Sequence, residues 1–256
     1  MSSSPSKWVY GKHSTLELLK IHPESLKQVL MIPPEGDTLR TEIATLCQGK
    51  KIPLRITDRK EVSQKAAAKA HQGVVAELAL REPYLSLEEL LARIQRDPGS
   101  NPLILVLDHI QDPHNLGAII RTAYGAGAAG IIVPQRRACP ISGAVRKAAA
   151  GAVEYVPLVQ VPNLARAIQT LKARGFWVLS LEAHSAVSLY SLDLGLSLVI
   201  VVGGEAGGVS PLLQKESDWV ASIPLKGNLT SLNASVACAI VLYETIRQRL
   251  GKSSPD

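Results

Sequence analysis

The most hydrophobic stretches of the chain are short runs separated by longer segments of mixed polarity. Residues 103–107 read Leu-Ile-Leu-Val-Leu, and residues 198–202 form a second unbroken apolar run. Such runs are typical of strands that are buried on both faces of a parallel sheet. Because segments with helical spacing fall between most of them, the pattern predicts an α/β fold. Strands are expected at 103–107, 130–133, 155–161, 176–181, 198–202 and 219–223, and helices at 116–126, 144–150, 164–174, 211–215 and 234–250.

The first 80 residues show the same alternation on a smaller scale. The pattern predicts helices at 13–20, 39–47 and 59–70 and strands at 26–32, 52–57 and 74–80. Residues 81–102 contain a weak helical segment and end in a run rich in Pro, Gly, Asp and Asn, which indicates a connector. We therefore expect an N-terminal α/β domain at 1–80, a linker at 81–102 and a second α/β domain at 103–256.

Charge favours a polyanionic partner. The chain has a formal net charge of +6, and residues 1–80 carry twelve Lys and Arg against eight Asp and Glu. A basic surplus in the smaller domain is what an RNA-binding module needs, although the solvated surface of any small domain would also account for it.

Several classes of protein and site are not supported by the sequence. No apolar run approaches the roughly 18 residues that span a membrane, and no signal segment follows the polar N-terminus. The three cysteines lack metal-ligand spacing, and His109 and His114 have no further cluster of ligands beside them. No Gly-x-Ser-x-Gly motif is present. We expect a cytoplasmic protein without a metal or a membrane segment.

Three segments at strand ends contain the candidate chemistry, because ligands of open α/β sheets bind there. In residues 108–123, Asn115 is a candidate N-cap, and Arg121 has apolar neighbours, so its guanidinium must reach an anion or lie along the surface. In residues 201–211, the glycines allow the backbone to approach a ligand closely, and Glu205 lies among them. In residues 223–237, five polar residues crowd the start of the last helix, more than capping requires: Asn228, Thr230, Ser231, Asn233 and Ser235.

The order of these motifs resembles one enzyme family. Asn115-x-Gly117-Ala-Ile-x-Arg121 is followed by Gly203-x-Glu205-x-x-Gly208, and then by Ile223-Pro224 and Ser231-Leu232-Asn233-x-Ser235-Val236-Ala237. This sequence resembles the SpoU (TrmH-type) family of RNA ribose 2′-O-methyltransferases. The segments Tyr10-Gly11-Lys12-His13 and His71-Gln72-Gly73-Val74-Val75-Ala76 resemble the small substrate-binding domain of its RlmB-like subgroup. Ala206 departs from the pattern, since many members carry Gly there.

The resemblance implies a fold and a site that composition does not reveal. The C-terminal domain is expected to contain a deep trefoil knot and to form a homodimer through its knot helices. S-adenosylmethionine is expected to contact Gly203, Ile223 and Leu232. Arg121 is the expected activator of the ribose 2′-hydroxyl. Four further residues are expected to shape the site around Arg121 and the ribose: Asn115, Glu205, Ser231 and Asn233.

The substrate implied by the subgroup is a guanosine of 23S rRNA. Alternatives that the residues leave open are a tRNA, a different rRNA position, or a non-catalytic RNA-binding factor of ribosome assembly. The presence of Asn115, Arg121, Glu205 and Asn233 favours an enzyme over the last of these.

Overall fold

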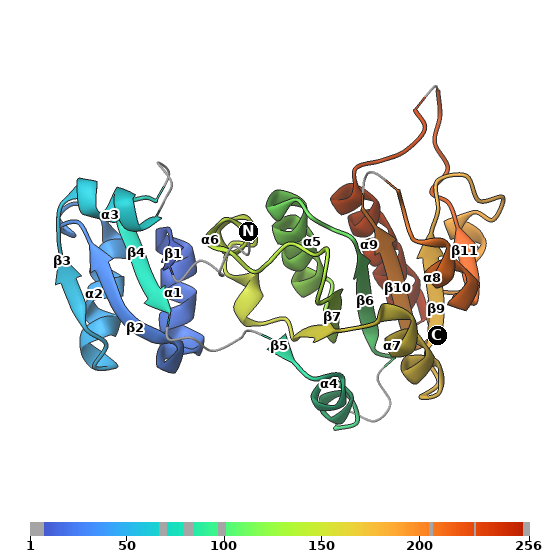
Figure 1. Cartoon of the computed structure of the whole chain (residues 1–256), viewed down its shortest axis with the longest axis horizontal. Coiled ribbons are helices and arrows are strands. Elements are labelled where there is room, and N and C mark those ends of the chain that lie inside the picture. The colour runs from blue at the N-terminus through green and yellow to red at the C-terminus, as the bar shows by residue number, and fades with distance from the viewer. Residues whose placement is uncertain are drawn as a thin grey trace. The chain divides into compact units, whose positions relative to one another are not determined.

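The computed structural model describes residues 8–66, 71–78, 84–96, 101–204, 207–227 and 229–252 (Figure 1). The chain divides into two compact units. The first contains Met1–Pro83 together with Pro140–Tyr155, and the second contains Tyr84–Cys139 and Val156–Asp256. Both units are α/β, as the hydrophobic pattern predicts.

The first unit is built on a four-stranded sheet in the order β1-β4-β2-β3. Its strands are β1 (Trp8–Tyr10), β2 (Leu26–Met31), β3 (Leu54–Ile56) and β4 (Val74–Leu78), and only the β2–β3 pair is parallel. Helices α1 (Lys12–Ile21) and α2 (Thr38–Gly49) pack on one face, and α3 (Arg59–Ala66) packs on the other. Alternate residues of β1, β2 and β4 therefore face two separate hydrophobic clusters.

Residues 140–155 pack with the first unit although they follow a strand of the second. They form α6 (Gly143–Ala148) and the 3-10 helix Ala152–Glu154. Gly143 lies so close to β1 that an added Cβ would stand 2.8 Å from the ring of Tyr10. The hydroxyl of Ser14 donates a hydrogen bond to the carbonyl of Arg146 (3.3 Å). Nothing in the local hydrophobic pattern identifies this long-range packing.

A buried ion pair between Arg146 and Glu154 holds this segment together, with side chains 6% and 10% exposed. We expect Glu154→Ala to lower the free energy of unfolding by about 3 kcal/mol or more, because it removes the carboxylate that pairs with a buried guanidinium. Chemical denaturation of the full chain measures this. Glu42→Ala, which removes the partner of Lys20 in a pair whose side chains are both 44% exposed, should cost under about 1 kcal/mol. Equal losses in the two variants would contradict the prediction.

The second unit contains a seven-stranded parallel sheet in the order β11-β9-β10-β6-β7-β8-β5. The runs at 103–107 and 198–202 are β6 and β10, its central strands, and every residue of β6 is buried. The strands are β5 (Tyr84–Leu85), β6 (Leu103–Asp108), β7 (Gly130–Pro134), β8 (Leu158–Val161), β9 (Trp177–Leu181), β10 (Leu198–Gly203) and β11 (Trp219–Ala221).

Helices cover this sheet in two groups (Figure 1). One group packs into a single hydrophobic cluster with β6, β7, β8 and β10: α4 (Leu87–Ile94), α7 (Leu164–Lys172) and α8 (Pro211–Glu216). The other group is α5 (Pro113–Gly125) and α9 (Ala234–Lys252), which lie against each other. The side chain of Gln248 fixes α9 to the segment before β10, accepting a hydrogen bond from the amide of Leu194 (2.8 Å).

The expected elements are found, with differences at their ends. The strand expected at 155–161 begins at Leu158, because residues 152–154 form a 3-10 helix in the first unit. The strand expected at 219–223 ends at Ala221. Strands β1 and β5 were not predicted, since runs of three and two residues carry too little periodicity. Residues 84–94 of the expected linker form β5 and α4, which belong to the second unit. The last four residues of the helix expected at 59–70 lie outside the described residues.

Candidate functional site

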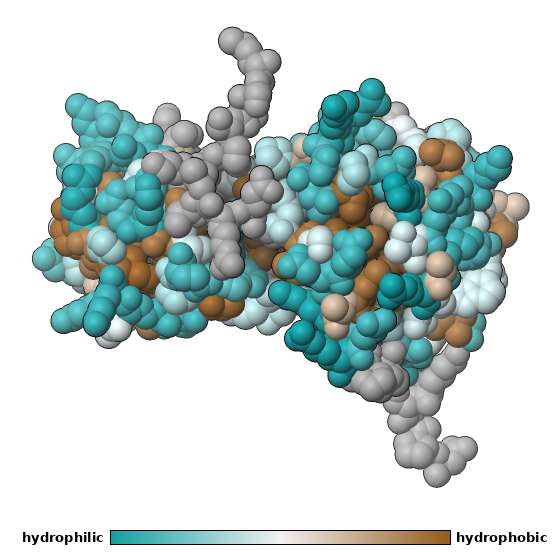
Figure 2. Space-filling model, turned by 60° about the horizontal axis from the view of Figure 1, so that its bottom comes forward, coloured by the Kyte–Doolittle hydropathy of each residue, from teal (hydrophilic) through white to brown (hydrophobic). Residues whose placement is uncertain are grey.

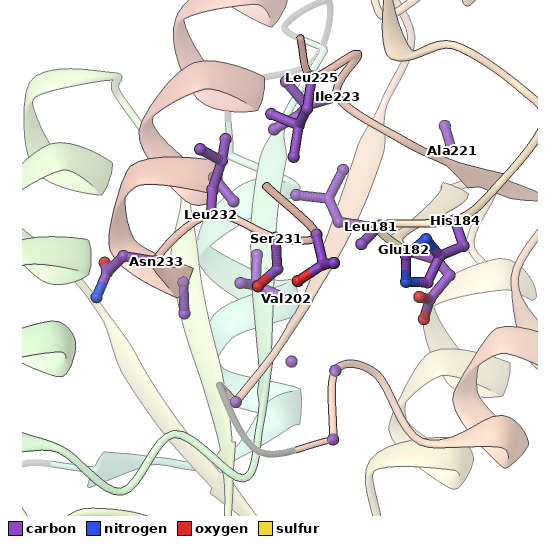
Figure 3. Close-up of a pocket in the computed structure, with 18 residues that line it drawn as sticks. Leu181, Glu182, His184, Val202, Ala221, Ile223, Leu225, Ser231, Leu232 and Asn233 are labelled. Atoms are coloured by element: carbon purple, nitrogen blue, oxygen red, sulfur yellow. The ribbon is translucent and has the colours of Figure 1, made fainter. Parts of the chain in front are cut away.

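A pocket of about 490 Å³ opens at the carboxyl ends of β9, β10 and β11 (Figure 3). Three segments supply most of its walls: residues 181–184 at the end of β9, residues 203–204 and 207–208 after β10, and residues 221, 223, 225 and 230–234 between β11 and α9. The chain passes from β10 through α8 to the edge strand β11 and then returns to α9 beside α5. This path brings two loops that follow different strands to one place.

The loop after β10 is closed by backbone contacts that only glycine permits. The amide of Gly204 donates to the carbonyl of Asp108 (2.9 Å), and the amide of Gly208 donates to the carbonyl of Gly204 (2.9 Å). A Cβ on Gly203 would stand 1.9 Å from the carbonyl carbon of Gly208, and a Cβ on Gly204 would stand 2.5 Å from the carbonyl oxygen of His109. The loop therefore presents bare backbone to the pocket, as the glycines of the sequence predict.

Asp108 positions this loop from the end of β6. Its carboxylate is buried, at 2% exposure, and accepts a hydrogen bond from the amide of Ser210 (2.8 Å). The same carboxylate lies 2.6 Å from Nδ1 of His109. Sequence reasoning did not single out Asp108. The sequence did contain a signal for it, because an acidic residue follows a wholly apolar run of five residues. A carboxylate in such a place needs hydrogen-bond donors to stay buried.

Asn233 joins the first and third motifs. Its Oδ1 accepts hydrogen bonds from the amide of Ser235 (2.9 Å) and so caps α9, while its Nδ2 donates to Oδ1 of Asn115 (3.0 Å). The N-cap of α5 is Asp112, which accepts from the amides of His114 and Asn115, so Asn115 is not the cap. Instead, the side chain of Asn115 accepts the hydrogen bond from Asn233, a residue 118 positions further along the chain.

Two ionisable residues of the pocket were missed from the sequence. Glu182 and His184 follow β9 and lie on the opposite side of the pocket from Leu232 and Asn233 (Figure 3). Oε2 of Glu182 accepts a hydrogen bond from Nε2 of Gln214 in α8 (2.9 Å). A carboxylate in this position favours a ligand that carries positive charge. Glu182 belongs to none of the three motifs, so only the fold connects it with them.

The structure brings most of the predicted site residues together. Gly203, Ile223, Leu232, Ser231 and Asn233 line the pocket, and Asn115 contacts Asn233. Arg121 does not line it: its side chain is exposed on α5, and no hydrogen bond or ion pair holds it among the described residues. Glu205 and Asn228 lie outside the described residues.

Other chemistries find little support in the described part of the chain. Burial raises the pKa of the Cys238 thiol to about 12 and that of the Cys47 thiol to about 11. Burial, together with the nearby charge of Asp112, raises the pKa of the Cys139 thiol to about 11. Such thiols are protonated at neutral pH and poorly nucleophilic. Where residues are described, no three His, Cys, Asp or Glu side chains are grouped to hold a metal ion, and no helix there is long and apolar enough to cross a membrane.

The chain matches known families along most of its length. Residues 102–243 match the SpoU rRNA Methylase family, and residues 8–84 match the family described as RNA 2′-O ribose methyltransferase substrate binding.

A protein of Pseudomonas aeruginosa, the 23S rRNA (guanosine-2′-O-)-methyltransferase RlmB, is 40% identical over 95% of this chain and 98% of its own length. The putative TrmH family tRNA/rRNA methyltransferase YacO of Bacillus subtilis is 35% identical over 96% of this chain and 98% of its own. Among solved structures, an AdoMet-bound rRNA methyltransferase of Sinorhizobium meliloti aligns with a TM-score of 0.78 at 26% identity, covering 94% of this chain and 86% of that one.

Proposed function

The chain belongs to the SpoU rRNA Methylase family, and we propose that it transfers a methyl group from S-adenosylmethionine to the ribose 2′-hydroxyl of a guanosine in 23S rRNA. The main support for this proposal is the pocket at the ends of β9, β10 and β11, where the second and third motifs of the family meet. The relative from Pseudomonas aeruginosa, with that activity in its name, supports the choice of substrate.

The pocket fits the cofactor on three grounds. Its volume of about 490 Å³ lies within the range of about 300–1,000 Å³ that is usual for small-molecule sites. The glycine loop offers backbone groups without side chains in the way, and Leu181, Ile223 and Leu232 supply apolar walls. Glu182 adds a negative charge, which suits a ligand with a sulfonium and an ammonium group. S-adenosylmethionine supplies a methyl group that is activated by its bond to the sulfonium.

The residues of the chain have to position the ribose and assist the loss of its proton. A neutral hydroxyl is a weak nucleophile, so in-line placement and proton removal provide the rate. Asn115 and Asn233 fix the start of α5 to the start of α9, and Ser231 lies between them and the glycine loop in the pocket wall. Arg121, exposed on α5, is available to an RNA phosphate or to the 2′-oxygen. Because a guanidinium stays protonated, we assign it orientation and charge stabilisation rather than the role of base.

The chain acts as a homodimer in this proposal, with α5 and α9 at the interface. Four large hydrophobic side chains on these helices are exposed: Tyr124 (49%), Val236 (47%), Tyr243 (54%) and Leu250 (67%). Hydrophobic residues also reach the surface elsewhere. Figure 2 shows brown, hydrophobic patches scattered over a mostly hydrophilic face. A cluster on two adjacent helices is better suited to a protein interface than isolated exposed residues are. We also propose that the knot expected from the family resemblance is formed by the segment that returns from β11 to α9. A protein that acts on rRNA is expected to work in the cytoplasm.

The alternatives differ in the RNA rather than in the fold. The relative in Bacillus subtilis carries both tRNA and rRNA in its name. A non-catalytic assembly factor would need no cofactor pocket, so the contact between Asn115 and Asn233 at the edge of such a pocket favours the enzyme.

Mapping of 2′-O-methyl groups after incubation with the purified full chain tests the proposal. Unmodified 23S rRNA, 16S rRNA and tRNA are each offered with S-adenosylmethionine. We expect one new methylated guanosine in 23S rRNA and none in the other two. Methylation of tRNA alone would replace the substrate, and no transfer to any RNA together with no heat of cofactor binding at millimolar concentration would reject the enzyme.

A further inference from the structure

The first unit contains a second pocket, of about 340 Å³, on the sheet face that α3 covers only in part. Trp8, Gln28 and Glu77 come from three neighbouring strands, and Arg55 and Lys65 stand at β3 and α3. Strand β3, which follows Pro53, and helix α3 leave this end of the sheet face accessible. Arg55 on β3 and Lys65 on α3 are both exposed. None of the family's three motifs contributes to this pocket.

Strand register explains why these side chains meet. Glu77 pairs with Trp8 of β1 on one side and with Gln28 of β2 on the other. Residues paired across neighbouring strands point to the same face of a sheet. Trp8, Glu77 and Gln28 therefore form one row across the sheet, an aromatic ring, a carboxylate and an amide side by side. In the next row, Leu30 and Val75 lie beneath α3 in a hydrophobic cluster.

Glu77 is an unusual residue for the floor of a surface pocket. It is only 6% exposed, and Oε2 accepts a hydrogen bond from Nε2 of Gln28 (2.6 Å). Lys27, whose side chain is 58% exposed, approaches it no closer than 3.9 Å. Burial of a carboxylate is unfavourable unless hydrogen-bond donors surround it, and Gln28 is one donor that the chain supplies. A carboxylate also accepts hydrogen bonds and donates none, so a ligand that meets it must present N–H or O–H groups.

The surroundings of Glu77 suit a nucleobase. Lys65 Nζ lies 5.2 Å from the centroid of the Trp8 ring, and Arg55 is exposed at the rim, where it pairs with Glu61. An aromatic ring beside basic side chains is the usual arrangement for stacking an unpaired base while cations attract the flanking phosphates.

We propose that this pocket binds an unpaired guanine base of the RNA substrate, with its Watson–Crick edge on Glu77 and its ring against Trp8. Guanine is the RNA base with two adjacent donors on that edge, N1–H and the 2-amino group, which match the two oxygens of a carboxylate. Adenine and cytosine place a donor beside an acceptor, and uracil has a single donor between two carbonyls. The inference rests on the proposed function only in taking RNA as the partner, and it adds a base-reading site distant in sequence from the methyl-transfer motifs.

Fluorescence anisotropy of labelled single-stranded RNA nonamers tests this on the full chain. Three oligonucleotides differ only at a central guanosine, inosine or adenosine in a uridine background. Inosine keeps N1–H and lacks the 2-amino group. We expect the guanosine RNA to bind about tenfold more tightly than the inosine RNA, the effect of one hydrogen bond to a charged group. The adenosine RNA should bind more weakly still, because adenine has neither of the two donors. Equal affinity of the wild-type chain for guanosine and inosine would overturn the proposal.

Glu77→Gln assigns the preference to this pocket, because the proposed methyl-transfer site also receives a guanosine. The amide keeps the shape but turns one acceptor into a donor, so the preference should fall to within about twofold. Glu42→Gln removes the same charge from α2 on the other face of the sheet and should keep the preference. A Glu77→Gln chain that still prefers guanosine would overturn the role of Glu77. Selective binding without methylation of any rRNA would refute the proposed function alone, and methylation without selectivity would refute this inference alone.

Discussion

Gly203→Ala should abolish measurable cofactor binding and, with it, methyl transfer. The added Cβ would stand 1.9 Å from the carbonyl carbon of Gly208, 2.0 Å from its oxygen and 2.2 Å from the amide nitrogen of Val209. These are backbone atoms, so no side-chain rotation relieves the contact, and the backbone at Gly203 and Gly208 has to shift in the pocket wall. We expect the affinity for S-adenosylmethionine to fall at least a hundredfold, about 2.7 kcal/mol.

Gly49→Ala is the control for this variant. Gly49 lies in α2 of the first unit, does not line the pocket, and a Cβ there meets no atom within 4 Å. We expect the affinity of this variant for S-adenosylmethionine to stay within about twofold of wild type when measured by calorimetry, because the added methyl group reaches no neighbouring side chain and no part of the pocket. Gly203→Ala binding with wild-type affinity, or an equal loss in Gly49→Ala, would show that backbone packing of the loop does not hold the cofactor.

Arg121→Ala should lower the single-turnover rate of methyl transfer about a hundredfold, or about 2.7 kcal/mol of transition-state stabilisation. Stability should barely change, because the side chain is exposed and no hydrogen bond or ion pair holds it among the described residues. Cofactor affinity should also stay near wild type, since Arg121 does not line the pocket. Arg121→Lys should recover little of the rate, because an ammonium cannot reproduce the planar fork of donors.

Arg166→Ala provides the comparison. Arg166 is exposed on α7, whose buried residues pack into the cluster on the sheet face away from α5 and α9, so the loss of one positive charge there should leave the rate unchanged. Melting temperature and cofactor titration are measured beside the rate. If Arg121 only stabilises its helix, thermal stability and cofactor binding fall together with activity. A folded Arg121→Ala chain that binds cofactor and methylates RNA at the wild-type rate would remove Arg121 from the mechanism.

The sequence predicted some residues of the candidate site and missed others. The difference depends on how far apart in the chain the contacting residues are. Gly203 and Gly204 could be identified because close backbone packing leaves a signature in the residue type itself. Glu182 could not, because its hydrogen bond to Gln214 and its place in the pocket depend on how β9, β10 and α8 pack. Asn115 was identified as a site residue, but its partner Asn233 is 118 positions away. Asp108 acts through the amide of Ser210, which is 102 positions away and far beyond any helix or strand period.

Local pattern is sufficient for the family of this protein and for its strands and helices, apart from the very short strands β1 and β5. The runs at 103–107 and 198–202 are apolar at every position, which is typical of strands covered on both faces, so hydrophobicity alone predicts β6 and β10. Each motif likewise consists of residues that are close together in the sequence. Packing between distant segments leaves no such local pattern. The inclusion of residues 140–155 in the first unit, the row formed by Trp8, Glu77 and Gln28, and the meeting of three loops at one pocket arise only when strand order and register are set, because those are relations between segments and not properties of any one of them.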